Sequence, residues 1–172
     1  MGPRDFEVLE HPADIGFRAF GGTLPELFAR SALAMLSIAA DPAAALPREE
    51  YPLAVESGDR ESLLVDWLNE VLYWFDGKLI AFRDFRVTQF RCGAGWKPAG
   101  GLLTRRLRRA QGAPPIGAQD AIPPHSIEAV GLGEPRDPLR HRARLIVKAV
   151  TYHQLKIERR GGLWVAEVYL DI

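Results

Sequence analysis

The sequence contains a single cysteine, Cys92, among its 172 residues. One cysteine cannot form an internal disulfide, and it excludes zinc sites that need several cysteines. No apolar run approaches the roughly 20 residues that a membrane-spanning helix needs, and no basic-then-apolar leader opens the chain. We therefore expect a cytoplasmic protein with no membrane partner.

An excess of charge of either sign is also missing. Lys and Arg total 22 residues, Asp and Glu total 22, and the formal net charge is zero. A neutral protein has no bulk attraction to nucleic acid or acidic membranes, so we expect no DNA partner. The apolar content of 47% is ordinary for a globular protein. A chain of this length has room for one sizeable core, and residues 1–172 are predicted to form one domain.

The motifs of several enzyme classes are absent as well. The sequence has no GxxxxGK[ST], GxGxxG, HExxH or GxSxG segment, and its four histidines are scattered. A metal-dependent hydrolase is one alternative function, and it would need a base beside the metal to activate water. No histidine or additional acid is placed for that role by the sequence.

Two amphipathic helices are predicted in the first half of the chain. Thr23-Leu24-Pro25-Glu26 forms a capping box with proline in the first turn, and the apolar face behind it ends near Asp41-Pro42. The second helix starts after Gly58-Asp59 and ends at Asp76-Gly77. Its other face carries a polar stripe that is either a partner surface or simply solvated: Ser62, Asp66, Asn69 and Tyr73.

Short strands are predicted around these helices from apolar and polar alternation. The segments are residues 6–9, 17–20, 53–56, 85–90, 126–132, 145–152, 155–158 and 163–170. Arg160-Gly161-Gly162 is expected to form the hairpin turn into the last strand. Strands and helices follow no regular βαβ order, and the late strands are consecutive. This predicts an α+β fold in which two main helices pack on one side of a mainly antiparallel sheet.

Residues 93–124 break this pattern. The segment is rich in glycine and proline, and it is predicted to be a flexible insertion between two strands. Its middle holds four arginines with no acidic residue before Asp120: Arg105, Arg106, Arg108 and Arg109. These side chains could contact RNA phosphate or an acidic partner, or they could form a solvated basic loop. An RNA-binding module built on this loop is a further alternative function.

Acidic residues near the two ends of the chain suggest a joint site. His11-Pro12-Ala13-Asp14-Ile15-Gly16 lies between two predicted strands, and the sequence ends in Asp171-Ile172 directly after the last strand. A strand that ends there would hold its last carboxylate in place. Asp14, Asp171 and the terminal carboxylate of Ile172 would offer the hard oxygen ligands that calcium and magnesium prefer. On spacing alone, the alternative is that Asp14 caps a turn and Asp171 faces solvent.

Lys148 interrupts the otherwise apolar segment from Leu145 to Val150. On a half-buried strand, a lysine ammonium group either reaches the surface or faces a carboxylate cluster. Both options stay open on the residues alone.

The order of these motifs resembles the archease family. The resemblance covers nearly the whole chain and rests on residues 11–21, residues 23–28, residues 63–70 with Tyr73, residues 147–153, and Asp171-Ile172. Two features depart from the family pattern. Pro12 stands where threonine is more usual, and the insertion at 93–124 exceeds the short connection expected in the family.

The resemblance implies an accessory protein, not an enzyme. Archeases assist the GTP-dependent tRNA-splicing ligase, which joins RNA ends bearing a cyclic or 3'-phosphate to a 5'-hydroxyl. The expected function is therefore activation of this RNA ligase, by promoting its guanylylation and repeated turnover in tRNA splicing or RNA repair. An alternative implied by the family is a chaperone that modulates a tRNA cytosine methyltransferase. The ligase is thus the expected partner, with tRNA and the methyltransferase as further candidates.

The resemblance also implies particular site residues. A calcium site is expected at Asp14, Asp171 and the main-chain end at Ile172, in agreement with the acidic cluster suggested by the chain ends. A functionally required lysine is expected at Lys148, and His11 is expected to contact the partner.

Overall fold

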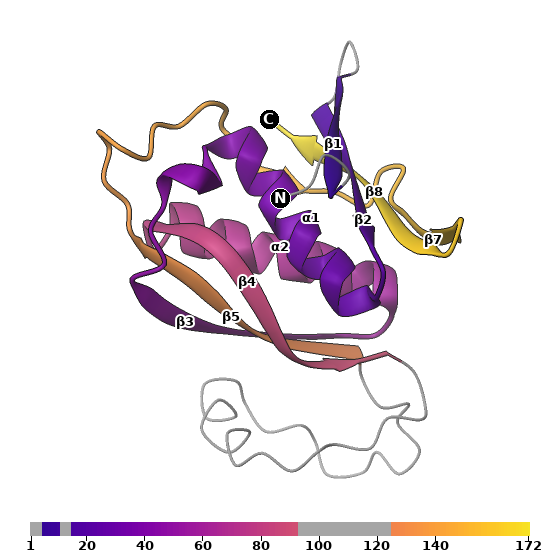
Figure 1. The fold of residues 1–172 in the computed structure, drawn as a ribbon. Coiled ribbons are helices and arrows are strands. Elements are labelled where there is room, and N and C mark those ends of the chain that lie inside the picture. The colour runs from indigo at the N-terminus through magenta and orange to yellow at the C-terminus, as the bar shows by residue number, and fades with distance from the viewer. Residues whose placement is uncertain (1–4, 11–14, 93–124) are drawn as a thin grey trace, which may run out of the picture.

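The computed structural model describes residues 5–10, 15–92 and 125–172. The elements in chain order are β1 (Phe6–Glu10), β2 (Ile15–Gly21), α1 (Leu24–Ala39), the short 3-10 helix η1 (Pro42–Ala44), β3 (Glu49–Ser57), α2 (Arg60–Asp76), β4 (Ile80–Arg91), β5 (His125–Pro135), β6 (Ala149–Val150), β7 (Lys156–Arg160) and β8 (Leu163–Asp171) (Figure 1). Neither α-helix in these ranges is long and apolar enough to cross a membrane.

Both helices begin where the sequence predicts. The hydroxyl group of Thr23 accepts a hydrogen bond from the main-chain N–H of Glu26 at 3.3 Å. The Glu26 carboxylate in turn accepts from the N–H of Gly22 at 2.8 Å, one residue earlier than in the usual capping box. At α2, the Asp59 carboxylate accepts from the N–H of Ser62 at 2.7 Å. These caps satisfy helix N–H groups that have no partner within the helix.

The strands form two antiparallel sheets. One sheet has the order β1-β2-β8-β6, with β7 also paired to β8, and the other has the order β3-β5-β4. The predicted α+β class, with two main helices and antiparallel pairing, is confirmed. The sequence analysis favoured one sheet, however, and the structure has two. Alternation along a strand reports which face is buried, but it does not report which strands share a sheet.

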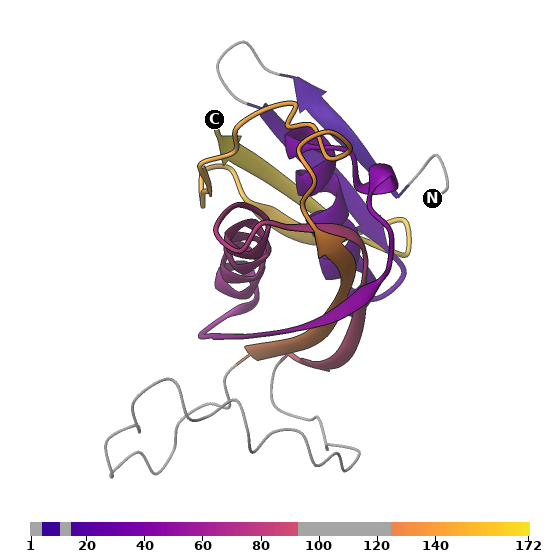
Figure 2. The ribbon, with the colours of Figure 1, turned by 90° about the vertical axis from the view of Figure 1, so that its left-hand side faces the viewer.

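The two helices lie between the sheets (Figure 2). α1 packs on β2 of one sheet and on β4 of the other, and α2 packs on β3 and on β6. Trp67 of α2, Phe17 of β2 and Phe85 of β4 belong to the same buried cluster. One apolar core therefore connects both helices with both sheets.

The late strands differ in length from the prediction. A strand was expected over 145–152, but β6 contains only Ala149–Val150. Ala149 pairs with Asp171 at the end of β8, so the residues before Lys148 lie past the end of the partner strand. The predicted turn is confirmed, because Gly161 and Gly162 have φ values of 56° and 84°, as in a type I′ hairpin turn. The predicted insertion at 93–124 lies outside the described residues.

Candidate functional site

Three of the predicted site residues meet at the end of β8. The main-chain N–H of Lys148 donates to the carbonyl oxygen of Asp171 at 2.8 Å. The Lys148 ammonium group donates to the main-chain oxygen of Ile172 at 3.2 Å, across 24 positions of sequence. The next two residues form β6 against β8, which fixes the main chain beside Lys148. The fold therefore places the main chains of Lys148 and Asp171 side by side at one end of the sheet.

His11 and Asp14 lie outside the described residues, as do Arg105, Arg106, Arg108 and Arg109. The structure does describe where the motif that contains His11 and Asp14 joins the sheet. Glu10 pairs with Ile15 across β1 and β2, and Ile15 pairs with Leu170, the residue before Asp171. The motif therefore leaves and re-enters the sheet at the end where Asp171 lies.

The donor atoms at this end of the sheet suit a hard cation. Asp171 is exposed and offers a carboxylate, and the main-chain oxygen of Ile172 is a second oxygen donor. Within 5–10, 15–92 and 125–172, no three His, Cys, Asp or Glu side chains are close enough to hold a metal ion. The ammonium group of Lys148 already contacts the Ile172 oxygen. A divalent cation on that oxygen would therefore compete with Lys148.

Asn69 of α2 holds the strand that follows Lys148. Its side-chain oxygen accepts a hydrogen bond from the N–H of Val150 at 3.0 Å, and its amide nitrogen donates to the Val150 carbonyl at 3.5 Å. β6 is at the edge of its sheet, where main-chain groups lack a strand partner. Helical spacing predicts Asn69 on the polar stripe of the helix, but it does not predict this contact, because the two residues are 81 positions apart.

Replacing Asn69 by alanine is expected to loosen this edge. The N–H and carbonyl groups of Val150 lose their side-chain partner, so the free energy of unfolding should fall by about 1 to 2 kcal/mol. Hydrogen exchange measured by NMR should be faster at the amides of Lys148 and Val150. Asn69→Asp keeps the acceptor oxygen and should protect the Val150 amide better than alanine does. Equal exchange in the alanine variant and the wild type would contradict this role of Asn69.

Large exposed apolar side chains lie near Lys148 in the sequence. Ile146 is 73% exposed and Tyr152 is 58% exposed, and both lie within four residues of Lys148 in sequence. Ile172, whose main-chain oxygen contacts Lys148, is 40% exposed. Exposed apolar and aromatic side chains are typical of protein–protein contact sites.

A buried ionic cluster anchors the segment that leads from β5 to Lys148. Glu134 and His141 are each 2% exposed, and Nε2 of His141 lies 3.2 Å from Oε1 of Glu134. Arg140 pairs with the other carboxylate oxygen at 2.9 Å, and the N–H of Leu46 donates to Oε1 at 2.9 Å. Arg140 and then the Leu46 N–H lower the pKa of Glu134 to about 2, against the opposing effect of burial. No local pattern in the sequence indicates this cluster.

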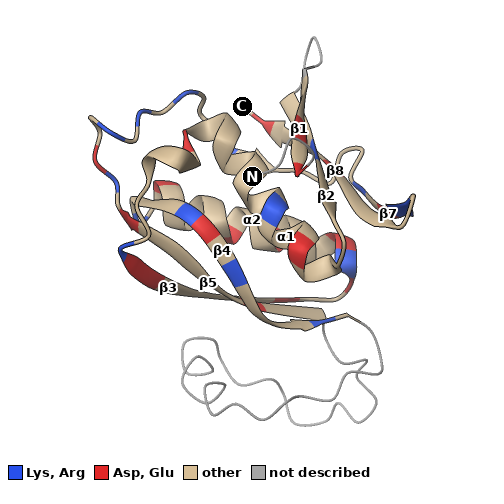
Figure 3. Cartoon of the chain, in the orientation of Figure 1, with Lys and Arg blue, Asp and Glu red and all other residues tan. Residues whose placement is uncertain are grey.

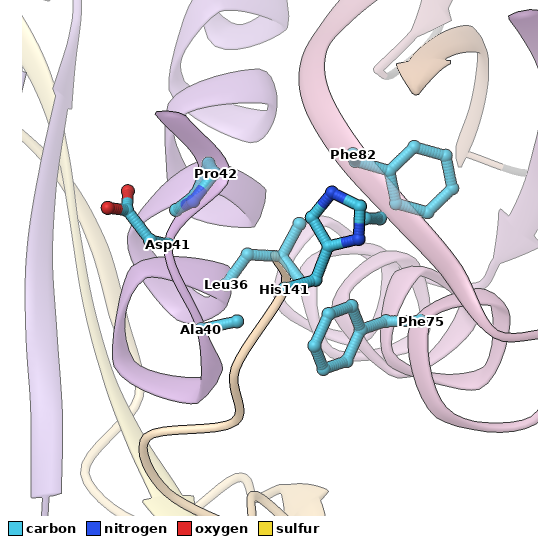
Figure 4. Close-up of a pocket in the computed structure, with 8 residues that line it drawn as sticks. Leu36, Ala40, Asp41, Pro42, Phe75, Phe82 and His141 are labelled. Atoms are coloured by element: carbon cyan, nitrogen blue, oxygen red, sulfur yellow. The ribbon is translucent and has the colours of Figure 1, made fainter. Parts of the chain in front are cut away.

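His141 also lines a small cavity together with apolar side chains that include Leu36, Phe75 and Phe82 (Figure 4). The cavity has a volume of about 10 Å³, which is room for one water molecule at most. Nδ1 of His141 accepts a hydrogen bond from the N–H of Asp137 at 2.8 Å. Both ring nitrogens therefore have protein partners, and His141 has a structural role here.

The chain is similar to known proteins over nearly its whole length. A sequence model of the Archease protein family (MTH1598/TM1083) matches residues 6–172. Protein archease of Methanopyrus kandleri is 34% identical over 167 residues, which cover 97% of this chain and 99% of the relative. Protein archease of Methanosarcina acetivorans is 36% identical over 169 residues, covering 98% of this chain and 97% of the relative.

Two solved structures share the fold. The solution structure of protein 1598 from Methanobacterium thermoautotrophicum matches with a TM-score of 0.71 at 30% identity, covering 98% of this chain and 99% of that chain. The crystal structure of a Thermotoga maritima archease, described as a possible chaperone, matches with a TM-score of 0.53 over 95% of this chain and 94% of that chain. At 18% identity, this second match shows the common fold alone. Because the family match and the relatives span nearly the whole sequence, the chain belongs to the archease protein family.

Proposed function

We propose that this protein is an accessory activator of the GTP-dependent tRNA-splicing RNA ligase, and that it is not itself an enzyme. It would promote guanylylation of the ligase and repeated turnover in tRNA splicing or RNA repair. One observation carries the proposal: a main-chain hydrogen bond holds the exposed residues Lys148 and Asp171 together, and exposed apolar side chains stand near them in the sequence. Membership of the archease family supports a helper role.

The surface suits a protein partner with a charged active site. Burial of Ile146, Tyr152 and Ile172 would supply apolar binding energy of about 25 cal/mol for each Å² removed from water. The neighbouring charges would set the orientation of the complex. A ligase that handles GTP, a divalent metal and RNA ends presents phosphate and carboxylate groups, and the Lys148 ammonium group can pair with either. Asp171 offers a carboxylate to a metal ion at the same place.

We also propose that this site binds a divalent cation, with calcium as the first candidate. Asp14, Asp171 and the main-chain oxygen of Ile172 would hold it, and it would supply positive charge for phosphate oxygens. The oxygen chemistry of Asp171 and Ile172 supports this proposal, as does the sheet register that joins the Asp14 motif to the end of β8. Calcium titration by calorimetry should show weaker binding to Asp171→Asn than to the wild type, independently of any ligase.

The ligase proposal is tested by multiple-turnover ligation with the cognate ligase. The ligase is limiting, and RNA with cyclic-phosphate ends and RNA with 5'-hydroxyl ends are in excess. The wild type should stimulate ligation. Lys148→Ala and Asp171→Asn should lower this stimulation by at least about tenfold, because a hydrogen bond to a charged group contributes about 1.5 to 3 kcal/mol.

Matched controls separate this surface from a general charge effect. Lys78→Ala removes an exposed lysine at the end of α2, and Glu56→Gln neutralises an exposed acid on β3. Both should stimulate ligation like the wild type. Full stimulation by Lys148→Ala and Asp171→Asn would mean that other residues of the protein activate the ligase. No stimulation by the wild type would refute the ligase role and would favour the methyltransferase chaperone, which the same exposed apolar side chains also suit.

A further inference from the structure

A tryptophan flanked by two arginines lies at the start of β8. The guanidinium carbon of Arg60 is 5.0 Å from the centre of the Trp164 ring, and that of Arg159 is 5.8 Å from it. Arg60 is the first residue of α2, and Arg159 pairs with Trp164 across the β7–β8 hairpin. β8 has nine residues and is therefore about 30 Å long. This site and the Lys148 surface thus lie at opposite ends of β8.

Arg60 and Arg159 contact the Trp164 ring, but no acidic side chain pairs with them within the described part of the chain. Neither guanidinium group forms an ion pair there, and Nε of Arg60 is buried without a hydrogen-bond acceptor. Other arginines of the same sheet are paired, since Arg18 contacts Glu167 at 2.9 Å and Arg160 pairs with Glu158. Buried donors normally have acceptors, so the unpaired Nε–H of Arg60 indicates a partner that accepts hydrogen bonds.

The chemistry of this partner follows from the two guanidinium groups. A guanidinium group that stacks on an aromatic ring keeps its N–H edge free, and that edge matches the oxygen atoms of a phosphate group. Two cations near one ring also repel each other, and a neighbouring anion reduces that repulsion. The ligand that fits Arg60 and Arg159 is therefore a phosphate.

The surroundings favour a phosphate that belongs to a polymer. Arg159 is exposed and Trp164 is half-buried, so the site is open to solvent. Lys and Arg positions are frequent along β7 (Figure 3), but Lys156 lies opposite Glu167 and Arg160 pairs with Glu158, so Arg60 and Arg159 supply the free charge. Free nucleotides are usually held in concave pockets, whereas single-stranded nucleic acid follows basic surfaces that carry aromatic side chains.

We propose that Arg60, Arg159 and Trp164 bind the phosphate backbone of single-stranded RNA. The contact reads the backbone and not the base sequence. This proposal does not depend on the ligase proposal, because it uses other residues and its test contains no ligase.

The test is fluorescence anisotropy of a labelled oligouridine of about 12 nucleotides, titrated with the full chain over a salt series. Wild-type binding should weaken as the salt concentration rises. Arg159→Gln should lower the affinity by about three- to tenfold, and it should reduce the slope of log affinity against log salt by about one. Arg159 is exposed, so this variant should fold like the wild type. Arg142→Gln removes an exposed arginine between β5 and β6 and should bind like the wild type.

Three results would overturn the proposal. The first is equal affinity of the wild type and Arg159→Gln. The second is loss of binding only when Arg105, Arg106, Arg108 and Arg109 are replaced, which would assign the RNA contact to the 93–124 segment. The third is complete competition by inorganic phosphate at the concentration of RNA phosphate, which would show a site for small anions. The proposal is supported if unlabelled RNA displaces the labelled oligouridine, inorganic phosphate does not, and Arg159→Gln lowers the affinity.

Discussion

Replacing Trp67 by alanine is expected to lower the free energy of unfolding by about 3 to 5 kcal/mol. Trp67 is fully buried in the core that both sheets share. Its ring packs edge-on against Phe85 at 5.6 Å between centroids, and its Nε1–H donates to the carbonyl of Phe28 at 3.0 Å. Alanine would leave a large cavity between α1, α2 and β4. Because a typical domain is stable by only 5 to 15 kcal/mol, we expect a visibly destabilised protein.

Urea unfolding followed by circular dichroism measures this loss. Trp74→Ala is the matched control, because Trp74 lies on the same helix but is half-buried, and its Nε1–H donates to the Glu70 carboxylate. Trp74→Ala should lower the free energy of unfolding clearly less than Trp67→Ala does. Trp67→Phe keeps an aromatic ring and should fall between the wild type and the alanine variant. If Trp67→Ala cost no more than Trp74→Ala, the shared core would not depend on Trp67 in the way the packing indicates.

The helices and the turn of this fold could be predicted because their signals are local. Thr23 and Asp59 cap helices through bonds to residues three positions later. Gly161 and Gly162 adopt positive φ in the hairpin turn, which glycine does at low cost. Each of these features depends on a few neighbouring residues, so the sequence contains all that is needed to infer it.

The division into two sheets and the buried contacts could not be predicted, because they depend on residues far apart in sequence. Asn69 supports Val150 across 81 positions, and Leu46 supports Glu134 across 88 positions. Glu134 is also an acid at the end of an apolar strand, a place where an acid usually faces solvent. Nothing local distinguishes a buried carboxylate with distant partners from an exposed one.

The candidate site was predicted in part. The chain ends and the family resemblance indicated Lys148 and Asp171-Ile172, and the structure places these residues in contact. Spacing alone left open whether Lys148 would reach solvent or face acids. Its ammonium group is exposed and binds a main-chain oxygen. The roles of all five residues stay predictions, and Asp14 and His11 also lie outside the described residues.

Glu134→Gln is expected to destabilise the protein at neutral pH. It should also remove the loss of stability that protonation of Glu134 causes in acid. The pKa of Glu134 is about 2 in the folded protein, against an ordinary value of 4.5. A carboxyl group whose pKa is lowered by folding stabilises the folded state above its unfolded pKa and loses this contribution as the pH falls through its folded pKa. The contribution of Glu134 should therefore be complete above about pH 4.5 and disappear toward about pH 2.

The melting temperatures of the wild type and Glu134→Gln should consequently converge in acid. At neutral pH the variant loses its charged contacts with Arg140 and Arg48, and its melting temperature should fall by more than about 5 °C. The difference should shrink between about pH 4.5 and pH 2. Glu56→Gln, which changes an exposed acid, should show neither effect. A difference that did not change with pH would mean that the amide disturbs packing and that the charge of Glu134 contributes little.

The same variant tests whether the buried Glu134 cluster affects the proposed ligase-binding surface at Lys148 and Asp171. Glu134 binds Arg140 and His141, which begin the segment that continues to Lys148. The end of that segment is held separately by the bonds of Lys148 to β8 and of Val150 to Asn69. Glu134→Gln should therefore reduce ligase stimulation less than Lys148→Ala does, because the Lys148 contacts remain. A loss as large as that of Lys148→Ala in folded protein would mean that the position of Lys148 depends on the buried cluster as well as on β8.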